Sequence, residues 1–346
     1  MKLLFSKIFQ SLLVMLGVVV LVFVMFQSLG DPAKLLIGQS GNQATIDNIK
    51  KELYLDQPGW KQLLFYINDV SPISIHNAST IKEKELNGFF VGGETKVGLK
   101  IPYLRKSYQT KKNTIAVIAD ALPGTIILTC CAMLFAIIVG ISLGIIAALR
   151  KNSWIDNTAI VSSIAGISAP SFFMAIVIAY IFGIVLHDYT GLSVTGSLYQ
   201  VNELTGEKTL ALKNLILPAI TLGIRPMAII TQLTRSSMLD VLGQDYIRTA
   251  YAKGLSKHKI ILRHALPNSL NPVITAVTGW FAELLAGAFF VEYIFGWKGL
   301  GKITVDALEK LDYPIVMGSV LVSAFIFVLV NMFSDILYKK LDPRIK

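Results

Sequence analysis

Residues 244–268 read QDYIRTAYAKGLSKHKIILRHALPN, a basic stretch that separates two long apolar regions of the chain. Residues 246–253 favour a helix, and Gly254 can adopt the left-handed backbone conformation that often follows a helix C-terminus. Ser256 suits the N-cap of a second helix, which we expect Pro267 to end. The stretch therefore predicts two short amphipathic helices joined by a turn.

Three roles are conceivable for a basic segment of this kind. It could lie on a membrane surface and bind anionic lipid. It could instead dock in a groove on a separate cytoplasmic subunit and pass that subunit's movement into the neighbouring helices. DNA binding fits poorly, because the apolar regions bracket the segment closely.

The apolar regions on either side are long enough to cross a bilayer. Hydrophobic residues make up 53% of the 346 residues and charged residues only 16%, against about 25% charged residues in soluble domains. A helix needs about 20 apolar residues to span the hydrocarbon core, where every backbone polar group must be hydrogen-bonded. We therefore predict an all-α polytopic membrane protein with six transmembrane helices. The expected spans are residues 8–29, 122–149, 158–186 with an interruption near Pro170, 214–238, 272–294 and 314–338.

Lys and Arg residues near the spans set the expected orientation. With the N-terminus inside, the short inside segments hold fourteen basic residues and few acids, as cytoplasmic segments do. Both termini should then be cytoplasmic, and the net charge of +10 needs no nucleic-acid partner. The first apolar run is longer than the core of a signal peptide, so we expect a retained helix.

The segment 30–121 is too long for a plain connection and should form a small external α/β cap. We expect a helix from Thr45 to Leu55, a turn over residues 56–60 and a short helix over 61–67. Scattered glycines after that suggest strands or loops. The chain thus divides into residues 1–29 with the first helix, the cap at 30–121, and a core at 122–346. Within the core, residues 240–270 form a cytoplasmic stretch that includes the basic segment.

Few charged residues fall within the expected spans. Glu283 lies in mid-span, where a charge is costly and usually faces a cavity or a partner charge. It is therefore a candidate for a translocation path, while a structural pair with Arg225 or a contact with a partner subunit is equally open. We expect Glu292 and Asp335 to be solvated at interfaces.

Some patterns resemble other sites but lack a required element. Residues 296–303, GWKGLGKI, match a phosphate-binding loop except that Ile303 replaces the hydroxyl residue that binds Mg²⁺. We expect a glycine-rich turn there instead. Neither the scattered histidines nor the adjacent Cys130 and Cys131 have the spacing of a metal site or a disulfide, so no metal is expected.

The basic segment resembles the EAA motif of bacterial ABC importer permeases. Arg248-Thr249-Ala250 stands where the name-giving Glu-Ala-Ala would be, a departure typical of the dipeptide/oligopeptide/nickel import branch. The resemblance extends over nearly the whole chain, and the chain resembles the first of the two permeases in such systems. Residues about 70–97 are extra relative to the family pattern. Further matching motifs are Gly30-Asp31-Pro32, Leu55-Asp56-Gln57-Pro58, Leu217-Pro218-Ala219, Gly299-Leu300-Gly301, Asp312-Tyr313-Pro314 and Asp342-Pro343-Arg344.

The resemblance implies a type I importer permease fold in the cell inner membrane, with no catalytic residues and no cofactor on this chain. It implies a heterodimer with a second homologous permease, two ABC ATPase subunits that bind ATP and Mg²⁺, and an external substrate-binding lipoprotein. The residues expected to couple the chain to the ATPases are Asp245, Tyr246, Arg248, Thr249, Ala250, Lys253, Gly254, Leu255, His264, Leu266 and Pro267.

Other functions stay open at this point. The resembled branch imports dipeptides, oligopeptides or nickel, so we expect peptides, with nickel or another small solute as the alternative. A membrane enzyme or assembly factor is less consistent, because no cluster of nucleophile, base or metal ligands is evident. A secondary transporter would usually show an inverted repeat, and six unequal spans show none.

Overall fold

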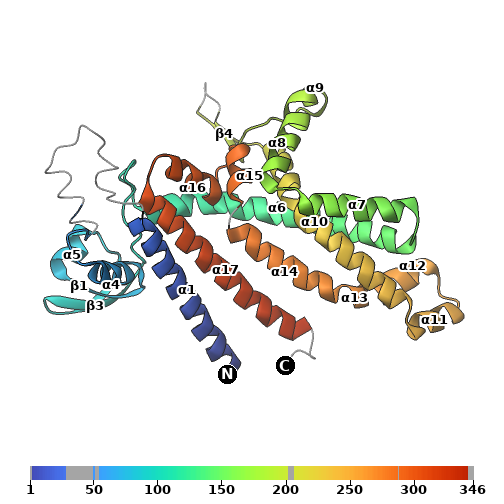
Figure 1. Ribbon diagram of the computed structural model, residues 1–346, viewed down its shortest axis with the longest axis horizontal. Helices are drawn as coiled ribbons and strands as arrows, with labels where there is room; N and C mark the ends of the chain where they lie inside the picture. Colours follow the sequence, from blue (N-terminus) through green and yellow to red (C-terminus); the bar gives the residue numbers. More distant parts are fainter. Residues whose placement is uncertain (1, 29–49, 51–53, 202–205, 287, 342–346) are drawn as a thin grey trace. The chain divides into compact units, whose positions relative to one another are not determined.

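The computed structural model describes residues 2–28, 50, 54–201, 206–286 and 288–341, and most of them are helical (Figure 1). The chain forms two compact units. The smaller unit contains Met1–Asp120 and Ile303–Phe325, and the larger contains Ala121–Lys302 and Ile326–Lys346.

Within the described residues, four helices are long and apolar enough to cross a membrane, at four of the predicted positions. They are α1 (Lys2–Ser28), α6 (Thr114–Leu149), α10 (Lys213–Leu242) and α17 (Tyr313–Leu341). Helix α10 contains both Pro218 and Pro226 without a break.

The predicted third span is a bent pair of helices. Helix α7 (Trp154–Ser168) is followed by α8 (Ser171–Tyr180), which continues as the π-helix η2 (Ile181–Val185). The bend between the two parts is 110°. Pro170 explains it, because the residue before a proline avoids helical angles, and Ala169 is extended with a ψ of 130°.

The predicted fifth span over residues 272–294 is not one helix. The chain forms α14 (Asn271–Ala286) and then the short α15 (Phe289–Ile294). Neither piece is long enough to qualify as a span by itself, so the count of six spans is not confirmed.

The smaller unit contains α1, α4 (Gly59–Val70) and a three-stranded antiparallel sheet in the order β1-β3-β2. Its strands are β1 (Ile73–Asn77), β2 (Gly88–Gly92) and β3 (Thr95–Lys100), with α5 (Ala78–Glu83) after β1. The predicted short helix and the strands are thus present. The predicted helix from Thr45 to Leu55 lies largely outside the described residues, as do the motifs at 30–32 and 342–344.

The larger unit is built around α10, which packs against α7, α8 and α14. Small residues let α6 approach α10 closely. A Cβ atom on Gly144 would lie 2.5 Å from the Thr234 Cβ, and one on Gly140 would lie 2.9 Å from the Ile230 Cγ2. Close approach through small residues is how membrane helices commonly associate. It fixes the C-terminal ends of α6 and α10, which carry the basic segment.

Short elements complete the larger unit. They are α9 (His187–Thr190), the hairpin of β4 (Tyr199–Val201) and β5 (Lys208–Leu210), α11 (Asp245–Ala252), α12 (Lys257–Ile260), the π-helix η3 (Ile261–Ala265), α13 (Leu266–Ser269) and the start of α16 (Leu300–Glu309).

Candidate functional site

The basic segment begins with α11, and its end confirms the predicted role of Gly254. The Gly254 φ is +75°. Its N–H donates to the Tyr251 carbonyl over 2.9 Å, and the Leu255 N–H donates to the Ala250 carbonyl over 3.3 Å. These two bonds form a Schellman motif, which satisfies carbonyls at the helix C-terminus and reverses the chain. No atom lies within 4 Å of a Cβ placed on Gly254, so the glycine is needed for its backbone angle alone.

The second half of the segment differs from the prediction at its end. Ser256 is extended and precedes α12, as expected of an N-cap residue, but its side chain makes no capping hydrogen bond. The chain then continues through η3 into α13. Pro267 lies in the first turn of α13 and does not end the second helix, so that prediction was wrong. A proline is tolerated there because N–H groups in a first turn have no partner within the helix.

One face of the segment is buried against the ends of two long helices. Ile247 and Ala250 of α11 join Ile260, Ile261 and Ala265 in an apolar cluster. The same cluster includes Ala148 at the end of α6 and Met238 near the end of α10. A movement applied to this segment would therefore be passed to both long helices.

The other face of the segment is exposed and charged. The Arg248 and Asp245 side chains are 77% and 95% exposed. Their 3.4 Å ion pair contributes little to the folding stability, because water screens it at such exposure. The predicted coupling residues differ in how far they are buried. Asp245, Tyr246, Arg248, Thr249, Lys253, Gly254 and Pro267 are exposed, Leu255, His264 and Leu266 are half-buried, and Ala250 is buried.

A buried ion pair near the segment was not predicted. The Arg235 guanidinium on α10 donates to both carboxylate oxygens of Asp156 on α7, over 2.5 and 2.8 Å. Asp156 is 1% exposed and also accepts from the Asn152 N–H over 2.9 Å. The Ser153 hydroxyl caps α7 by accepting from the Asp156 N–H. The pattern Ser-x-x-Asp at a helix start could have revealed the cap, though not the distant arginine.

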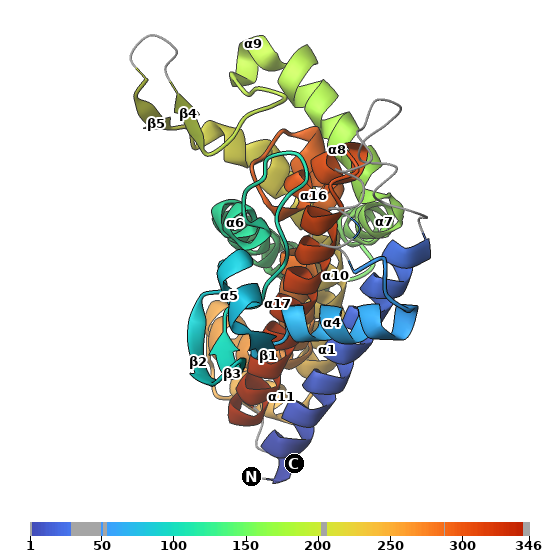
Figure 2. The same cartoon turned by 90° about the vertical axis from the view of Figure 1, so that its left-hand side faces the viewer.

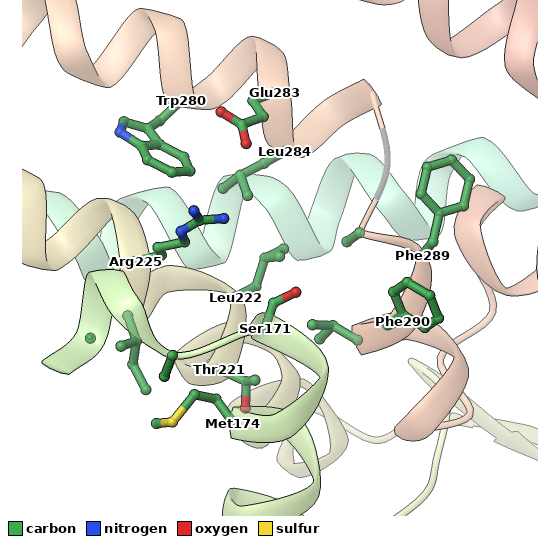
Figure 3. Close-up of a pocket in the computed structure, with 15 residues that line it drawn as sticks. Ser171, Met174, Thr221, Leu222, Arg225, Trp280, Glu283, Leu284, Phe289 and Phe290 are labelled. Atoms are coloured by element: carbon green, nitrogen blue, oxygen red, sulfur yellow. The ribbon is translucent and has the colours of Figure 1, made fainter.

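Arg225 and Glu283 line one open cavity of about 130 Å³ in the larger unit (Figure 3). Arg225 reaches from α10 toward α14, where its guanidinium lies 5.6 Å from the Trp280 ring centroid. Within the residues that the structure describes, the ion pairs do not include one between Arg225 and Glu283. The two charges thus share a cavity with aromatic walls, including Phe289 and Phe290, without neutralising each other directly.

A second open cavity adjoins the first. It also includes Trp280 and Glu283, and its other walls come from α14 and from Phe327 and Asn331 on α17. Glu283 therefore faces a continuous polar and aromatic surface, as expected for a residue on a translocation path. A role of Glu283 in transport stays a prediction.

Glu292 is buried, so the expectation that it is solvated was wrong. Its side chain is 0% exposed. One carboxylate oxygen accepts from the Thr125 hydroxyl over 2.7 Å, and the other accepts from the Gly301 and Lys302 N–H groups over 2.7 and 3.2 Å. The carboxylate therefore caps the start of α16 and ties it to α6.

The glycines of residues 296–303 make room for this carboxylate. A Cβ on Gly299 would lie 2.3 Å from a Glu292 oxygen, and one on Gly301 would lie 3.0 Å from it. The Trp297 ring is fully buried, and its N–H donates to the Gly124 carbonyl over 2.9 Å. The glycine-rich turn is confirmed, and its N–H groups hold an anion of the chain itself where a phosphate-binding loop would hold a phosphate.

Comparison with known proteins gives these features a context. Residues 140–346 match the family model of the binding-protein-dependent transport system inner membrane component, and residues 1–129 match its N-terminal model. The chain is 36% identical over 347 residues to the dipeptide transport system permease protein DppB of Alkalihalophilus pseudofirmus, covering 96% of each chain. It is 33% identical over 328 residues to the glutathione transport system permease protein GsiC of Escherichia coli O6:H1, covering 94% of this chain and 93% of that one.

A solved structure supports the fold. The chain superposes with a TM-score of 0.50 and 18% identity on a chain of the MetNI methionine ABC transporter in an inward-facing conformation, covering 66% of this chain and 97% of that chain. The family matches and the similar permease proteins identify a membrane transport subunit, which is not itself an enzyme. The chain belongs to the family of binding-protein-dependent transport system inner membrane components.

Proposed function

We propose that this chain is the permease subunit of an ATP-driven importer of short peptides. In this proposal it forms half of the translocation path, beside a second homologous permease. Two ATPase subunits bind ATP and Mg²⁺ beneath it, and an external binding protein delivers the peptide. Both chain termini and the basic segment are cytoplasmic, and the cap is external.

The coupling role rests on one observation: residues 245–269 have one buried face and one exposed face. The buried face is anchored on the ends of α6 and α10, while Tyr246, Arg248 and Thr249 are exposed. The buried face attaches the segment to both helices, and the exposed face leaves its side chains accessible to a partner subunit. A segment that only lay on lipid would present most of its apolar side chains to the lipid, whereas here five of them are buried in the anchoring cluster and Tyr246, Tyr251 and Leu262 are partly exposed.

The chemistry of the Arg225 and Glu283 cavity supports a peptide substrate. A short peptide at neutral pH carries an ammonium group at one end and a carboxylate at the other. Glu283 and Arg225 could attract these opposite ends, and Trp280 offers an apolar surface for a side chain. The peptide-transport names of the similar proteins point to the same substrate class.

An uptake assay in cells that lack the chain tests the substrate class. We expect loss of uptake of radiolabelled dialanine, restored by the natural chain, with nickel uptake unchanged. Glu283→Gln should lower dialanine uptake severalfold, while Asp188→Asn, which changes an exposed carboxylate on α9, should leave it unchanged. Loss of nickel uptake with intact dialanine uptake would instead favour a nickel importer.

A further inference from the structure

The sheet of the smaller unit has an apolar face that its own unit leaves uncovered. The strand register aligns these residues in two rows across the three strands. Each of the six side chains is between 52% and 76% exposed. The rows are Ile73, Leu99 and Phe89, and Ile75, Val97 and Val91.

The opposite face of the same sheet is polar and buried. Ser74, His76 and Lys100 are at most 6% exposed. The Lys100 ammonium donates to the Asp69 carbonyl, and Lys84 forms an ion pair with the Asp69 carboxylate over 2.7 Å. Burial lowers the pKa of Lys100 to about 8. A sheet in water buries its apolar face and exposes its polar face, so this arrangement is the reverse of the usual one.

Contacts between α4 and α1 give the position of the sheet relative to the membrane. The apolar span of α1 ends at Gln27, whose side chain donates to Gln62 near the start of α4. Farther along α4, the Tyr66 ring lies 5.9 Å from the Phe23 ring. Phe23 is one helical turn, about 6 Å, deeper in the span than Gln27. Helix α4 therefore runs from the end of the span toward the hydrocarbon, and β1 follows it directly.

The pictures agree with this direction. Figures 1 and 2 both show the strands on the side of α4 toward the N-terminus of α1, below the level of the C-terminal end of α1. Helix α4 also exposes Trp60 and Leu64, by 63% and 56%. Tryptophan is typical of the membrane–water interface, and so Trp60 beside the end of the span is consistent with that level.

We propose that the six-residue apolar face of β1, β2 and β3 rests in the boundary between headgroups and acyl chains of the leaflet that the C-terminal end of α1 reaches. The exposed apolar side chains of α1, such as Leu21 and Met25, would meet the same lipid, so the face continues a surface that already requires acyl chains. Insertion is limited to side-chain depth, because β1 and β2 are edge strands whose unpaired backbone groups need water or headgroups.

Lipid is favoured over a protein partner by this continuity. A stable protein contact would be expected to pair apolar residues with a polar rim, whereas this face joins the lipid-facing surface of α1 through α4. The cap would thereby be held against the membrane by its apolar face and by the contacts of α4 with the end of α1. The proposal rests on the proposed topology only for the choice of leaflet.

Spin labelling of the assembled transporter in nanodiscs tests the proposal. The native Cys130 and Cys131 are replaced by serine, and a nitroxide is attached at Val97→Cys. A matched label at Glu94→Cys, in the turn between β2 and β3, provides the exposed control. We expect the label at 97 to collide severalfold more with oxygen, relative to a water-soluble nickel chelate, than the label at 94.

Three results would overturn the proposal. The first is equal accessibility to the chelate at both positions in the absence of the external binding protein. The second is protection at 97 only after that protein is added, which would make the face its docking surface. The third is spin–spin broadening that reveals a second copy of this chain. The proposed transport function would survive each of them, since peptide uptake is measured separately.

Discussion

Gly254 shows how one residue can set the geometry of the basic segment. Its positive φ is costly for any residue with a side chain, by about 1–2 kcal/mol. We predict that Gly254→Val loses most ATP-coupled uptake, whereas Gly254→Asn retains most of it, because asparagine tolerates the left-handed conformation.

The two variants form a matched pair, because neither side chain would meet another atom within 4 Å of the Cβ. Uptake and the amount of protein in the membrane are measured together. Equal uptake in the Val and Asn variants, at equal amounts of protein, would show that the left-handed turn does not matter for coupling.

Gly299 makes the second prediction at the residue scale. A methyl group there would overlap the buried Glu292 carboxylate, and overpacking of this kind costs about 1–3 kcal/mol. Gly299→Ala should therefore lower the unfolding temperature of the purified protein. Gly93→Ala is the control, because a Cβ on Gly93 has no neighbour within 4 Å. An unfolding temperature that falls equally in both variants would contradict the tight fit.

Residue-level prediction from sequence succeeded where the backbone angle was decisive and failed where folding buried a charge. Gly254 follows a predicted helix and lies two residues before Ser256, the predicted N-cap of the next helix, so its role could be predicted locally. Glu292 looks like any acid near a helix end, and what covers it lies nine residues later at Gly301 and on another helix at Thr125. The two nearby glycines were the available signal.

At the scale of elements, the two faces of α11 should respond differently to mutation. Arg248→Glu changes an exposed side chain, so we expect stability to change by less than about 0.5 kcal/mol while co-purification of the ATPase is lost. Ala250→Asp places an unpaired charge in the buried cluster and should destabilise the protein itself. Thermal unfolding and co-purification measured on the same preparations distinguish the two effects. A destabilised Arg248→Glu protein would contradict this division.

The ion pair between α7 and α10 should also be measurable. Removing one partner of a buried pair typically costs about 3–5 kcal/mol. We predict that Asp156→Asn and Arg235→Gln each lower the unfolding free energy strongly, and that the double variant costs clearly less than the sum. Additive losses in this double-mutant cycle would mean that the two side chains do not stabilise each other.

Long apolar helices were predictable, because twenty apolar residues are hard to accommodate otherwise. The interruption near Pro170 was also predictable, because the residue before a proline avoids helical angles. The break between α14 and α15 was not, because the mostly apolar run from 272 to 294 continues through it. In the cap, the strand positions were only suggested by glycines, and the exposed apolar face depends on a register that composition does not specify.

At the scale of the whole molecule, the proposed mechanism is a transfer of movement between subunits. In the proposed mechanism, a segment built on the ends of α6 and α10 receives movement from a separate ATP-hydrolysing subunit and passes it to α10, which lines the Arg225 and Glu283 cavity. The close packing of α6 on α10 through Gly140 and Gly144 would make the two helices move together. The central claim is therefore the contact between the exposed face of α11 and that subunit.

Photo-cross-linking in the assembled transporter tests this contact most directly. A benzoylphenylalanine replaces Tyr246 or Tyr251, which are 44% and 48% exposed on α11, or Tyr189 on α9, which is 88% exposed, as the control. We predict that the probes at 246 and 251 capture the ATPase subunit and that the probe at 189 does not. Capture of the ATPase from position 189, with none from 246 or 251, would contradict the account.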